Sequence, residues 1–246
     1  MKIFFTILTY LLVALISYLI GSISFSKIIA NHYGVDITKV GSLNAGGTNV
    51  GRSISKKAGI MTMTLDLFKC YIPMLITFLV FNFWRYPNIY LYDQFKEVIC
   101  CLSGVCVSLG HVYPIFYKFK GGKAVACFSG FCLFISPILF ALAAVFFFSV
   151  FSIKKRVSLA SILGTIFCFL MSLIPMILDL TVLNKPTDFN GGLYFSIDCM
   201  LHLTYVTTIV YTFFLVLIIV KHRSNIKRLI NGEEPETKFK KIEKNN

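Results

Sequence analysis

Cysteine pairs at metal-binding spacing are absent from this chain. Its eight cysteines lie mainly in apolar segments, and none belongs to a C-x-x-C pair. Because metal sites usually show themselves as cysteine and histidine residues at such spacings, the sequence predicts no metal site. The cysteines are expected to be small, buried hydrophobic residues.

Nucleotide-binding signatures are absent too. The glycine-rich segment 41–52 lacks the G-x-x-x-x-G-K-[ST] order of a P-loop, and it lies between apolar segments rather than after a strand. The sequence also shows no internal repeat, and no serine or cysteine has a base at triad-like spacing. We therefore expect no cofactor, no duplicated architecture and no covalent nucleophile.

Acidic residues are scarce, at 11 against 24 lysines and arginines, which gives a net charge of +13. A nucleic-acid-binding protein gathers such charge on one face of a soluble domain. Here the basic residues are scattered between apolar segments. They are better explained as markers of membrane orientation, so no nucleic-acid partner is expected.

Long hydrophobic runs dominate what is present: hydrophobic residues make up 57% of the chain. Since a helix needs about 20 apolar residues to cross a bilayer, these runs predict an all-α membrane protein with about seven transmembrane helices. The first run has no convincing A-x-A cleavage site and is taken as a retained helix rather than a signal peptide. The expected helices cover residues 3–30, 58–83, 96–116, 124–135, 137–153, 157–183 and 197–220. They form one membrane domain, 1–232, followed by a charged, solvated tail, 233–246.

Basic flanks predict the orientation of these helices. Lysines and arginines follow the first, third, fifth and last expected helices, whereas the connections 84–95 and 184–196 carry few of them. By the positive-inside rule the basic ends are cytoplasmic. The N-terminus is then outside and the C-terminus is cytoplasmic.

The segment 124–151 has two interpretations, one long tilted helix or two short helices broken at Ser136-Pro137. Both of its ends are basic, so an even number of crossings is required, and proline removes a helical donor. We therefore predict a hairpin at Pro137. Each arm, at about 12–17 residues, spans only about 18–26 Å of a core about 30 Å thick.

Three polar clusters, at residues 41–52, 111–123 and 222–233, interrupt the apolar chain at its membrane boundaries. Glycines let backbone N–H groups turn inward, while Ser, Thr, Asn, Lys and Arg add donors and positive charge. Together the clusters predict phosphate binding at one membrane face. A flexible linker at 41–52, and topology markers at the other two, are the alternatives.

These clusters resemble the integral-membrane acylphosphate:glycerol-3-phosphate acyltransferases of bacterial phospholipid synthesis. Segment 41–52 is similar to G-S-G-N-x-G-A-T-N-x-x-R, 110–123 to G-H-x-x-P-x-F-x-x-F-K-G-G-K-G, 157–161 to V-S-L-x-S, and 222–233 to H-R-x-N-I-x-R-L-x-x-G-x-E. Leu43 and Ala124 stand where the family pattern has glycine. A side chain at Leu43 narrows the expected loop if that position needs a positive φ.

The resemblance implies transfer of a fatty acyl group from acyl phosphate to the 1-hydroxyl of glycerol 3-phosphate, giving lysophosphatidic acid and phosphate. It implies a bacterial plasma-membrane enzyme with a cytoplasmic active site, in contact with membrane lipids but with no obligatory protein partner. The implied catalytic residues are Ser42, Arg52, Lys123, His222 and Asn225. The implied substrate-binding residues are Gly41, Asn44, Gly46, Gly47, Thr48, Asn49, His111, Gly121, Gly122, Ser158 and Glu233.

A transporter of a phosphorylated metabolite is the alternative function, because it would need the same anion sites. Transporter sites usually lie near the bilayer midplane between repeated halves. Here the candidate residues gather at one face, and the chain shows no internal duplication. The enzyme is therefore the favoured interpretation.

Overall fold

The computed structural model describes residues 2–83, 92–178 and 205–240. The regular elements of this part of the chain are all helical. They are α1 (Lys2–Gly21), α2 (Phe25–His32), α3 (Gly47–Ser53), α4 (Lys56–Phe83), α5 (Tyr92–Val112), the 3-10 turn η1 (Ile115–Tyr117), α6 (Val125–Ile135), α7 (Pro137–Lys154), α8 (Val157–Leu178), α10 (Tyr205–Lys221) and α11 (Arg223–Ile230).

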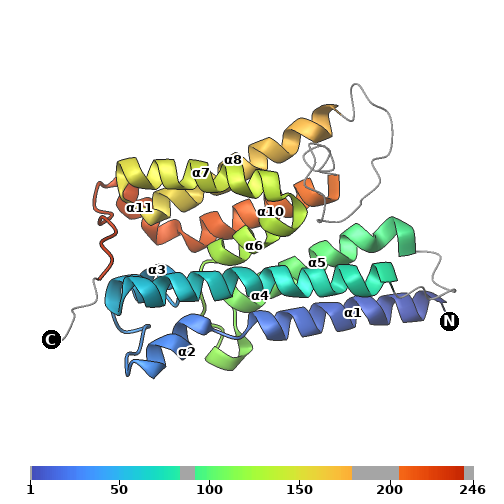
Figure 1. Cartoon of the computed structure of the whole chain (residues 1–246), viewed down its shortest axis with the longest axis horizontal. Helices are drawn as coiled ribbons and strands as arrows, with labels where there is room; N and C mark the ends of the chain where they lie inside the picture. The colour runs from blue at the N-terminus through green and yellow to red at the C-terminus, as the bar shows by residue number, and fades with distance from the viewer. Residues whose placement is uncertain (1, 84–91, 179–204, 241–246) are drawn as a thin grey trace.

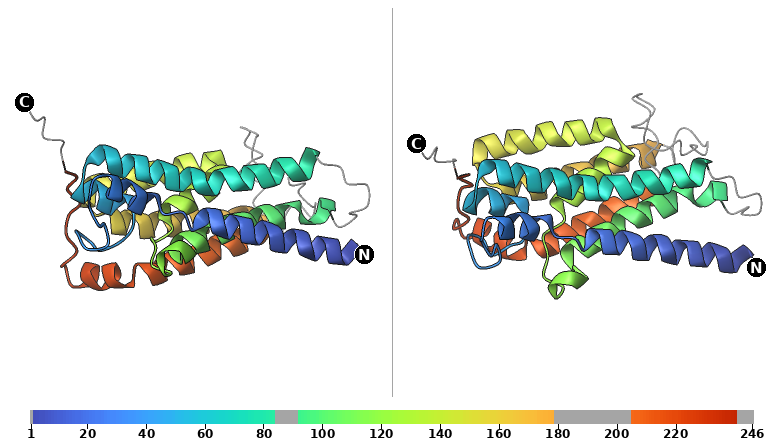
Figure 2. Two further views of the ribbon diagram at one scale, coloured as in Figure 1. Left: turned by 90° about the horizontal axis from the view of Figure 1, so that it is seen from below. Right: turned by 60° about the horizontal axis from the view of Figure 1, so that its bottom comes forward.

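The long helices lie side by side along one axis (Figure 1). α1 packs on α5, and α5 packs on α4, while α7 packs on α8 and α8 on α10. The short helix α6 lies between the two groups, against α4 and α7. The short helices α2, α3 and α11 gather at the end away from the N-terminus, which is also the end where the described chain finishes (Figure 2).

Close helix contacts in this bundle require glycine. A Cβ added at Gly21 would meet the Val107 carbonyl oxygen at 2.1 Å, and one added at Gly130 would meet the Leu67 oxygen at 2.3 Å. Small residues of this kind let membrane helices approach closely. They bring α1 against α5 and α6 against α4.

The first apolar run, expected as one helix over 3–30, is two helices. α1 ends at Gly21 and α2 begins at Phe25, with Ser24 in an extended conformation between them. The two helices still form a single candidate membrane span, Ile3–His32. The expected boundary is wrong, but the break adds no crossing.

The predicted break at Ser136-Pro137 is confirmed. α6 ends at Ile135 and α7 begins at Pro137, with the Ser136 hydroxyl accepting a hydrogen bond from the Leu139 N–H at 3.2 Å. Serine at the N-cap and proline at the first helical position are favoured at this place in a helix. The sequence at 136–137 therefore both ends α6 and starts α7.

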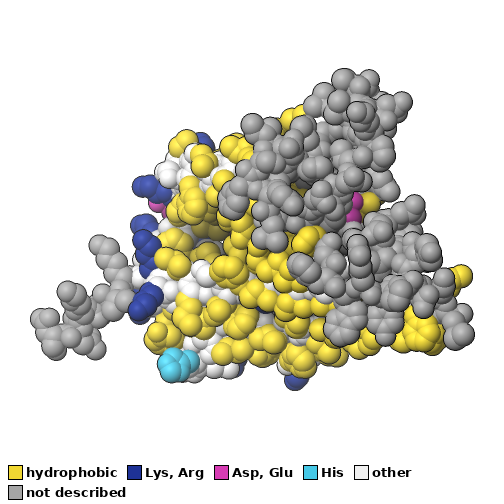
Figure 3. All heavy atoms as spheres, turned by 45° about the vertical axis from the view of Figure 1, so that its right-hand side comes forward, with side chains coloured by type: hydrophobic (Ala, Val, Ile, Leu, Met, Phe, Trp, Pro, Cys, Tyr) yellow, Lys and Arg dark blue, Asp and Glu magenta, His cyan; other side chains and the backbone are white. Residues whose placement is uncertain are grey.

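An all-helical, multi-pass membrane protein is confirmed. Five helices of the described chain are long and apolar enough to span a membrane, or six if the bent pair α10 and α11 forms one span. Exposed hydrophobic side chains cover the flanks of the bundle, and lysine and arginine side chains gather at one end (Figure 3). The outer connections expected at 84–95 and 184–196 lie largely outside the described residues.

Cysteines fill the core as expected. Six of the seven that the structure describes are buried, Cys106 is half-buried, and all seven are free thiols. Several pack among the rings of Phe128, Phe131, Tyr211 and Phe214. The eighth, Cys199, lies outside the described residues.

The tail expected from residue 233 is not solvated over its first part. Glu234 and Thr237 are buried, and the backbone of Lys240 exchanges hydrogen bonds with Gly51 and Lys56. Sequence composition predicts solvation from the charge of these residues, but charge does not exclude packing when each buried group finds a partner. The structure therefore extends to Lys240 as part of the bundle's end.

Two non-glycine residues adopt the left-handed conformation where the family pattern has glycine. Leu43 has φ of 58° and Ala124 has φ of 62°. This conformation crowds Cβ against the following carbonyl and costs about 1–2 kcal/mol. The concern raised by the sequence at Leu43 is thus confirmed.

Replacing Leu43 by glycine is expected to stabilise the protein. Leu43 is 63% exposed, so little burial is lost. Relief of the left-handed strain outweighs the added freedom of glycine in the unfolded chain by about 0.5–1 kcal/mol. Thermal unfolding of the purified protein should show a melting temperature higher by about 2 °C. Leu43→Ala, which keeps Cβ, is the control and should show no gain; equal gains in both variants would contradict this account.

Candidate active site

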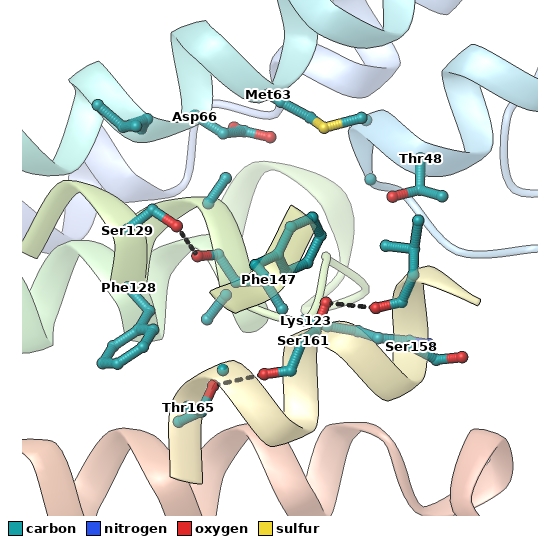
Figure 4. A pocket seen from close by; sticks show the side chains of 18 of the residues that line it. Thr48, Met63, Asp66, Lys123, Phe128, Ser129, Phe147, Ser158, Ser161 and Thr165 are labelled. Atoms are coloured by element: carbon teal, nitrogen blue, oxygen red, sulfur yellow. Dashed lines mark hydrogen bonds between the residues drawn. The ribbon is translucent and has the colours of Figure 1, made fainter. Parts of the chain in front are cut away.

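One cavity of about 340 Å³ brings the polar clusters together. Side chains from α3, α4, α6 and α8 point into it, and Phe147 of α7 lies among them (Figure 4). Along α8 it extends from Val157 to Cys168, a rise of about 17 Å at 1.5 Å per residue. The cavity therefore reaches from the basic end of the bundle into its apolar interior.

Most of the predicted site residues line this cavity. They are Ser42, Asn44, Gly46, Gly47, Thr48, Asn49, Arg52, His111, Lys123, Ser158, His222 and Asn225. Gly41, Gly121, Gly122 and Glu233 do not line it. Three of these four residues are glycines that make room for neighbouring atoms, and the fourth, Glu233, is exposed.

The first cluster is a loop tied around Asn49. The Asn49 amide donates to the carbonyl oxygens of Ile37, Val40 and Asn44, and its side-chain oxygen accepts from the Ser42 N–H at 2.9 Å. A plain linker would not need this network. Asn49 therefore holds the loop in shape, and its polar atoms are already occupied although it borders the cavity.

Gly41 serves the same loop rather than the cavity. It has φ of +59°, and a Cβ there would meet the Asn49 side-chain oxygen at 2.2 Å. Both the backbone conformation and the lack of space require glycine. Gly41 is therefore required for the shape of the loop, and it does not itself line the cavity.

Arg52 points a charged group at the cavity from α3. Its Nη2 donates to the Thr237 hydroxyl at 2.6 Å, while its Nε is buried and has no hydrogen-bond partner among the described residues. Burial lowers the pKa of Arg52, but a guanidinium remains charged. Arg52 thus has positive charge and at least one unused donor for an anion.

The second cluster folds its glycines over His111. A Cβ at Gly121 would meet the His111 carbonyl oxygen at 2.0 Å, and one at Gly122 would meet the His111 Nε2 at 2.1 Å. The Gly122 N–H donates to the same carbonyl at 3.1 Å. These two glycines were expected to bind substrate, yet they are required for packing and lie outside the cavity lining.

A buried ion pair lies behind His111. Asp66 and Lys69, three residues apart on α4, are 2.8 Å apart, and the Asp66 carboxylate is 3.6 Å from the His111 Nδ1. Lys69 also donates to the Ile23 carbonyl at 2.8 Å. Pairing of this kind reduces the cost of charge inside a membrane protein.

Lys123 connects the second cluster to the third. Its ammonium donates to the side-chain oxygen of Asn225, whose amide in turn donates to Glu234 Oε1 at 2.8 Å. Burial lowers the pKa of Lys123 to about 8. The lysine is therefore mostly protonated at neutral pH but loses its charge within a reachable pH range.

Glu234, not Glu233, is the acidic residue of the site. Its carboxylate accepts hydrogen bonds from Ser158 and Asn225, and from Arg228 at 2.7 Å, whereas Glu233 is exposed. Burial raises the pKa of Glu234, but these donors outweigh that effect and hold it below its usual value. Counted from His222, the final glutamate of the pattern H-R-x-N-I-x-R-L-x-x-G-x-E falls on residue 234, so the expected role of Glu233 was displaced by one residue.

His222 presents a neutral ring to the cavity. Its Nδ1 donates to the Ile218 carbonyl at 2.8 Å, because a carbonyl oxygen can only accept. Burial and the neighbouring charge of Lys123 lower the pKa of His222 to about 4. The Nε2 lone pair is therefore left as an acceptor.

The apolar part of the cavity was not predicted. Its wall comes mainly from α6, α7 and α8, and includes Phe128, Cys132, Phe140, Ala143, Ala144, Phe147, Phe148, Gly164 and Cys168. No group of three or more metal-ligating side chains occurs in the described part of the chain. The cavity combines two cations at one end with hydrocarbon walls at the other, and this combination suits an anionic lipid.

The fold and the site define an integral-membrane protein that handles a phosphate-bearing lipid. A family model described as glycerol-3-phosphate acyltransferase matches residues 11–232. A glycerol-3-phosphate acyltransferase of Mycoplasmopsis synoviae is 36% identical over 242 residues, covering 98% of this chain and 100% of that protein. One of Bacillus cytotoxicus is 34% identical over 239 residues, covering 96% and 99%.

Solved structures agree with these matches. The chain is similar to the crystal structure of PlsY (YgiH), an integral membrane glycerol 3-phosphate acyltransferase, in its glycerol 3-phosphate form, with a TM-score of 0.70, 32% identity and coverage of 93% and 95%. The lysophosphatidic acid form gives a TM-score of 0.69. This chain therefore belongs to the integral-membrane glycerol-3-phosphate acyltransferase family, as its motifs suggested. It acylates glycerol 3-phosphate to lysophosphatidic acid.

The pKa of Lys123 predicts an alkaline limit to activity. Above pH 8 the ammonium loses its proton, so kcat/KM measured against pH should fall by about tenfold per unit. Lys123→Arg keeps its charge and should lose this fall, whatever its absolute rate. Lys120→Arg, an exposed change in the same loop, is the control and should keep it. An unchanged alkaline limb in Lys123→Arg would show that another group titrates.

Proposed function

We propose that the acyl donor is acyl phosphate and that its acyl group is transferred directly to the 1-hydroxyl of glycerol 3-phosphate. The observation that carries this proposal is the single cavity in which Arg52 and Lys123 stand at one end of a wall of apolar side chains. A phosphoryl head and a hydrocarbon tail fit these two environments. An already activated donor also needs no enzyme nucleophile, which agrees with the burial of the described core cysteines.

The phosphoryl group of the donor would be bound between the first and second clusters. Arg52 and Lys123 supply charge-assisted hydrogen bonds, and Ser42 and Thr48 supply neutral donors from the neighbouring loop and α3. Gly46 and Gly47 border the same part of the cavity. Gly47 also lets α3 approach α4 closely, because a Cβ there would meet the Met63 side chain at 2.5 Å and the Gly59 carbonyl oxygen at 2.9 Å. In this proposal Gly41 and Asn49 keep the loop in its binding shape.

Glycerol 3-phosphate would be positioned from the other side. Solved relatives are described in glycerol 3-phosphate and lysophosphatidic acid forms, which supports binding of both molecules in this cavity. Ser158, Asn225 and Asn44 border it with hydrogen-bonding groups, and the His222 Nε2 can accept from a substrate hydroxyl. His111, with both glycines packed over it, is better suited to shaping the site than to removing a proton.

The proposed reaction has one transfer step. The glycerol oxygen attacks the acyl carbonyl carbon, the bond from that carbon to the phosphate oxygen breaks, and the hydroxyl proton leaves with phosphate. A histidine with a pKa of about 4 is a weak base, which supports a dianionic phosphate as the final proton acceptor. The fixed cations stabilise charge on the departing phosphate.

The proposed setting is a bacterial plasma membrane, crossed seven times, with an outer N-terminus and a cytoplasmic C-terminus. The gathering of lysines and arginines at the end that holds the cavity supports a cytoplasmic active site (Figure 3). The separation of α6 from α7 supports counting them as two crossings, although α6 is short. A metabolite transporter is disfavoured because the candidate residues converge near one end.

The donor can be tested by phosphate release. Purified protein given synthetic acyl phosphate should release phosphate and form lysophosphatidic acid only when glycerol 3-phosphate is present. Arg52→Ala should lose about 10- to 150-fold in kcat/KM, the worth of one charged hydrogen bond.

Mass spectrometry without glycerol 3-phosphate should find no acyl group on the protein. An acyl adduct on Ser42 formed at the catalytic rate would replace direct transfer by two steps, and vesicle uptake of glycerol 3-phosphate without acylation would favour the transporter.

Topology can be tested by labelling single cysteines in a background without reactive native cysteines. Positions near Asn49, Lys120 and Lys155 should react with an impermeant reagent only from the cytoplasmic face, and a position near Asn88 only from outside. The positive-inside distribution is the physical reason. A probe beside Pro137 that reacts from the cytoplasm would contradict seven crossings.

A further inference from the structure

Residues 235–240, called here the C-terminal strap, join two sides of the bundle's basic end. The Thr237 N–H donates to the Lys155 carbonyl at 2.7 Å, in the turn between α7 and α8. The Lys240 N–H donates to the Gly51 carbonyl at 3.0 Å, and the Lys56 N–H donates to Lys240 at 3.1 Å. Figure 2 shows this segment running across the end of the molecule. The strap therefore connects α3 and α4 to α7 and α8, which stand on different sides of the cavity.

The strap packs against α3 and α7 beside Arg52. The Phe239 ring lies 6.4 Å from that of Phe151, and a Cβ at Gly51 would meet Phe239 at 2.7 Å. Gly51 is one residue before Arg52 on α3. Packing of the strap thus depends on the same turn of α3 that carries Arg52.

Thr237 contacts Arg52 with its hydroxyl. This oxygen accepts from the Arg52 Nη2 at 2.6 Å and from the Val157 N–H at 3.4 Å, and the threonine is buried. The Arg52 side chain has no carboxylate within ion-pair distance among the described residues. A neutral acceptor fixes the plane of a guanidinium without cancelling its charge.

We propose that Thr237 is a positioning residue that orients Arg52 toward the phosphoryl group of the acyl donor. The proposal rests on the role proposed above for Arg52. A carboxylate at this place would compete with the substrate for the guanidinium, whereas a hydroxyl occupies one Nη2 donor and leaves the charge and the other terminal N–H groups for the anion. The family model ends at residue 232, so the strap lies beyond the residues it matches.

The test compares Thr237→Val, which removes the hydroxyl but keeps the side-chain shape, with Thr237→Ser, which keeps a hydroxyl. Glu236→Gln is a matched control because it alters an exposed side chain of the same strap. Each purified full-length variant is assayed with acyl phosphate and glycerol 3-phosphate varied in turn, and its melting temperature is measured. Arg52→Ala is assayed beside them.

Thr237→Val should lower kcat/KM for acyl phosphate by about tenfold, the lower end for a hydrogen bond to a charged group. The KM for glycerol 3-phosphate should change by less than about twofold, Thr237→Ser should restore activity, and Glu236→Gln should match the wild type. Wild-type kinetics in Thr237→Val beside an impaired Arg52→Ala would overturn the positioning role alone. Near-normal turnover in Arg52→Ala would instead remove the proposed function of Arg52.

A purely structural strap gives a different result. Thr237→Val would then lower the melting temperature and affect both substrates alike, without rescue by serine. If Thr237→Val does not fold, Thr237→Ala supplies the same comparison without a branched side chain. Failure of both variants to fold would overturn the proposal, because the hydroxyl would then be needed for the fold itself.

Discussion

Burial of charge at one end of the bundle is the constraint on which the rest of this structure depends. An isolated carboxylate in such a place would be costly, and Glu234 avoids that cost by accepting from Ser158, Asn225 and Arg228. These donors belong to α8 and α11, so satisfying one carboxylate fixes both helices relative to the chain's end. Asn225 also accepts from Lys123, which places the cation of the second cluster in the same network.

Hydropathy and basic flanks predict most of this fold because bilayer thickness and charge act directly on helix length and position. The expected helix 137–153 is α7, Pro137–Lys154, and the break before it follows from proline chemistry. A break inside an apolar run that contains no proline cannot be predicted in this way. The division of 3–30 into α1 and α2 occurs where Gly21 meets the backbone of α5, a contact between distant residues that no local pattern encodes.

The polar half of the site is predictable because phosphate binding requires particular residue types, and these are rare in an apolar chain. Individual roles are less predictable. Gly41 and Gly122 look like binding glycines, yet each makes room for a neighbouring side chain. Glu233 and Glu234 have the same chemistry, and the spacing from His222 together with packing selects the second. The apolar wall gives no signal, since Phe147 in the cavity resembles any phenylalanine that faces lipid.

Neutral acceptors hold both cations of the site. Arg52 donates to the Thr237 hydroxyl and Lys123 to the Asn225 amide, while the Glu234 carboxylate is bonded to Ser158, Asn225 and Arg228 rather than to either cation. Glu234 acts on both cations through space but bonds to neither, so their positive charge is oriented and only partly offset. In the proposed reaction the departing phosphate gains charge as its bond to the acyl carbon breaks. Donors already fixed in place can stabilise that charge without rearranging, whereas cations paired with carboxylates would first have to give up their partners.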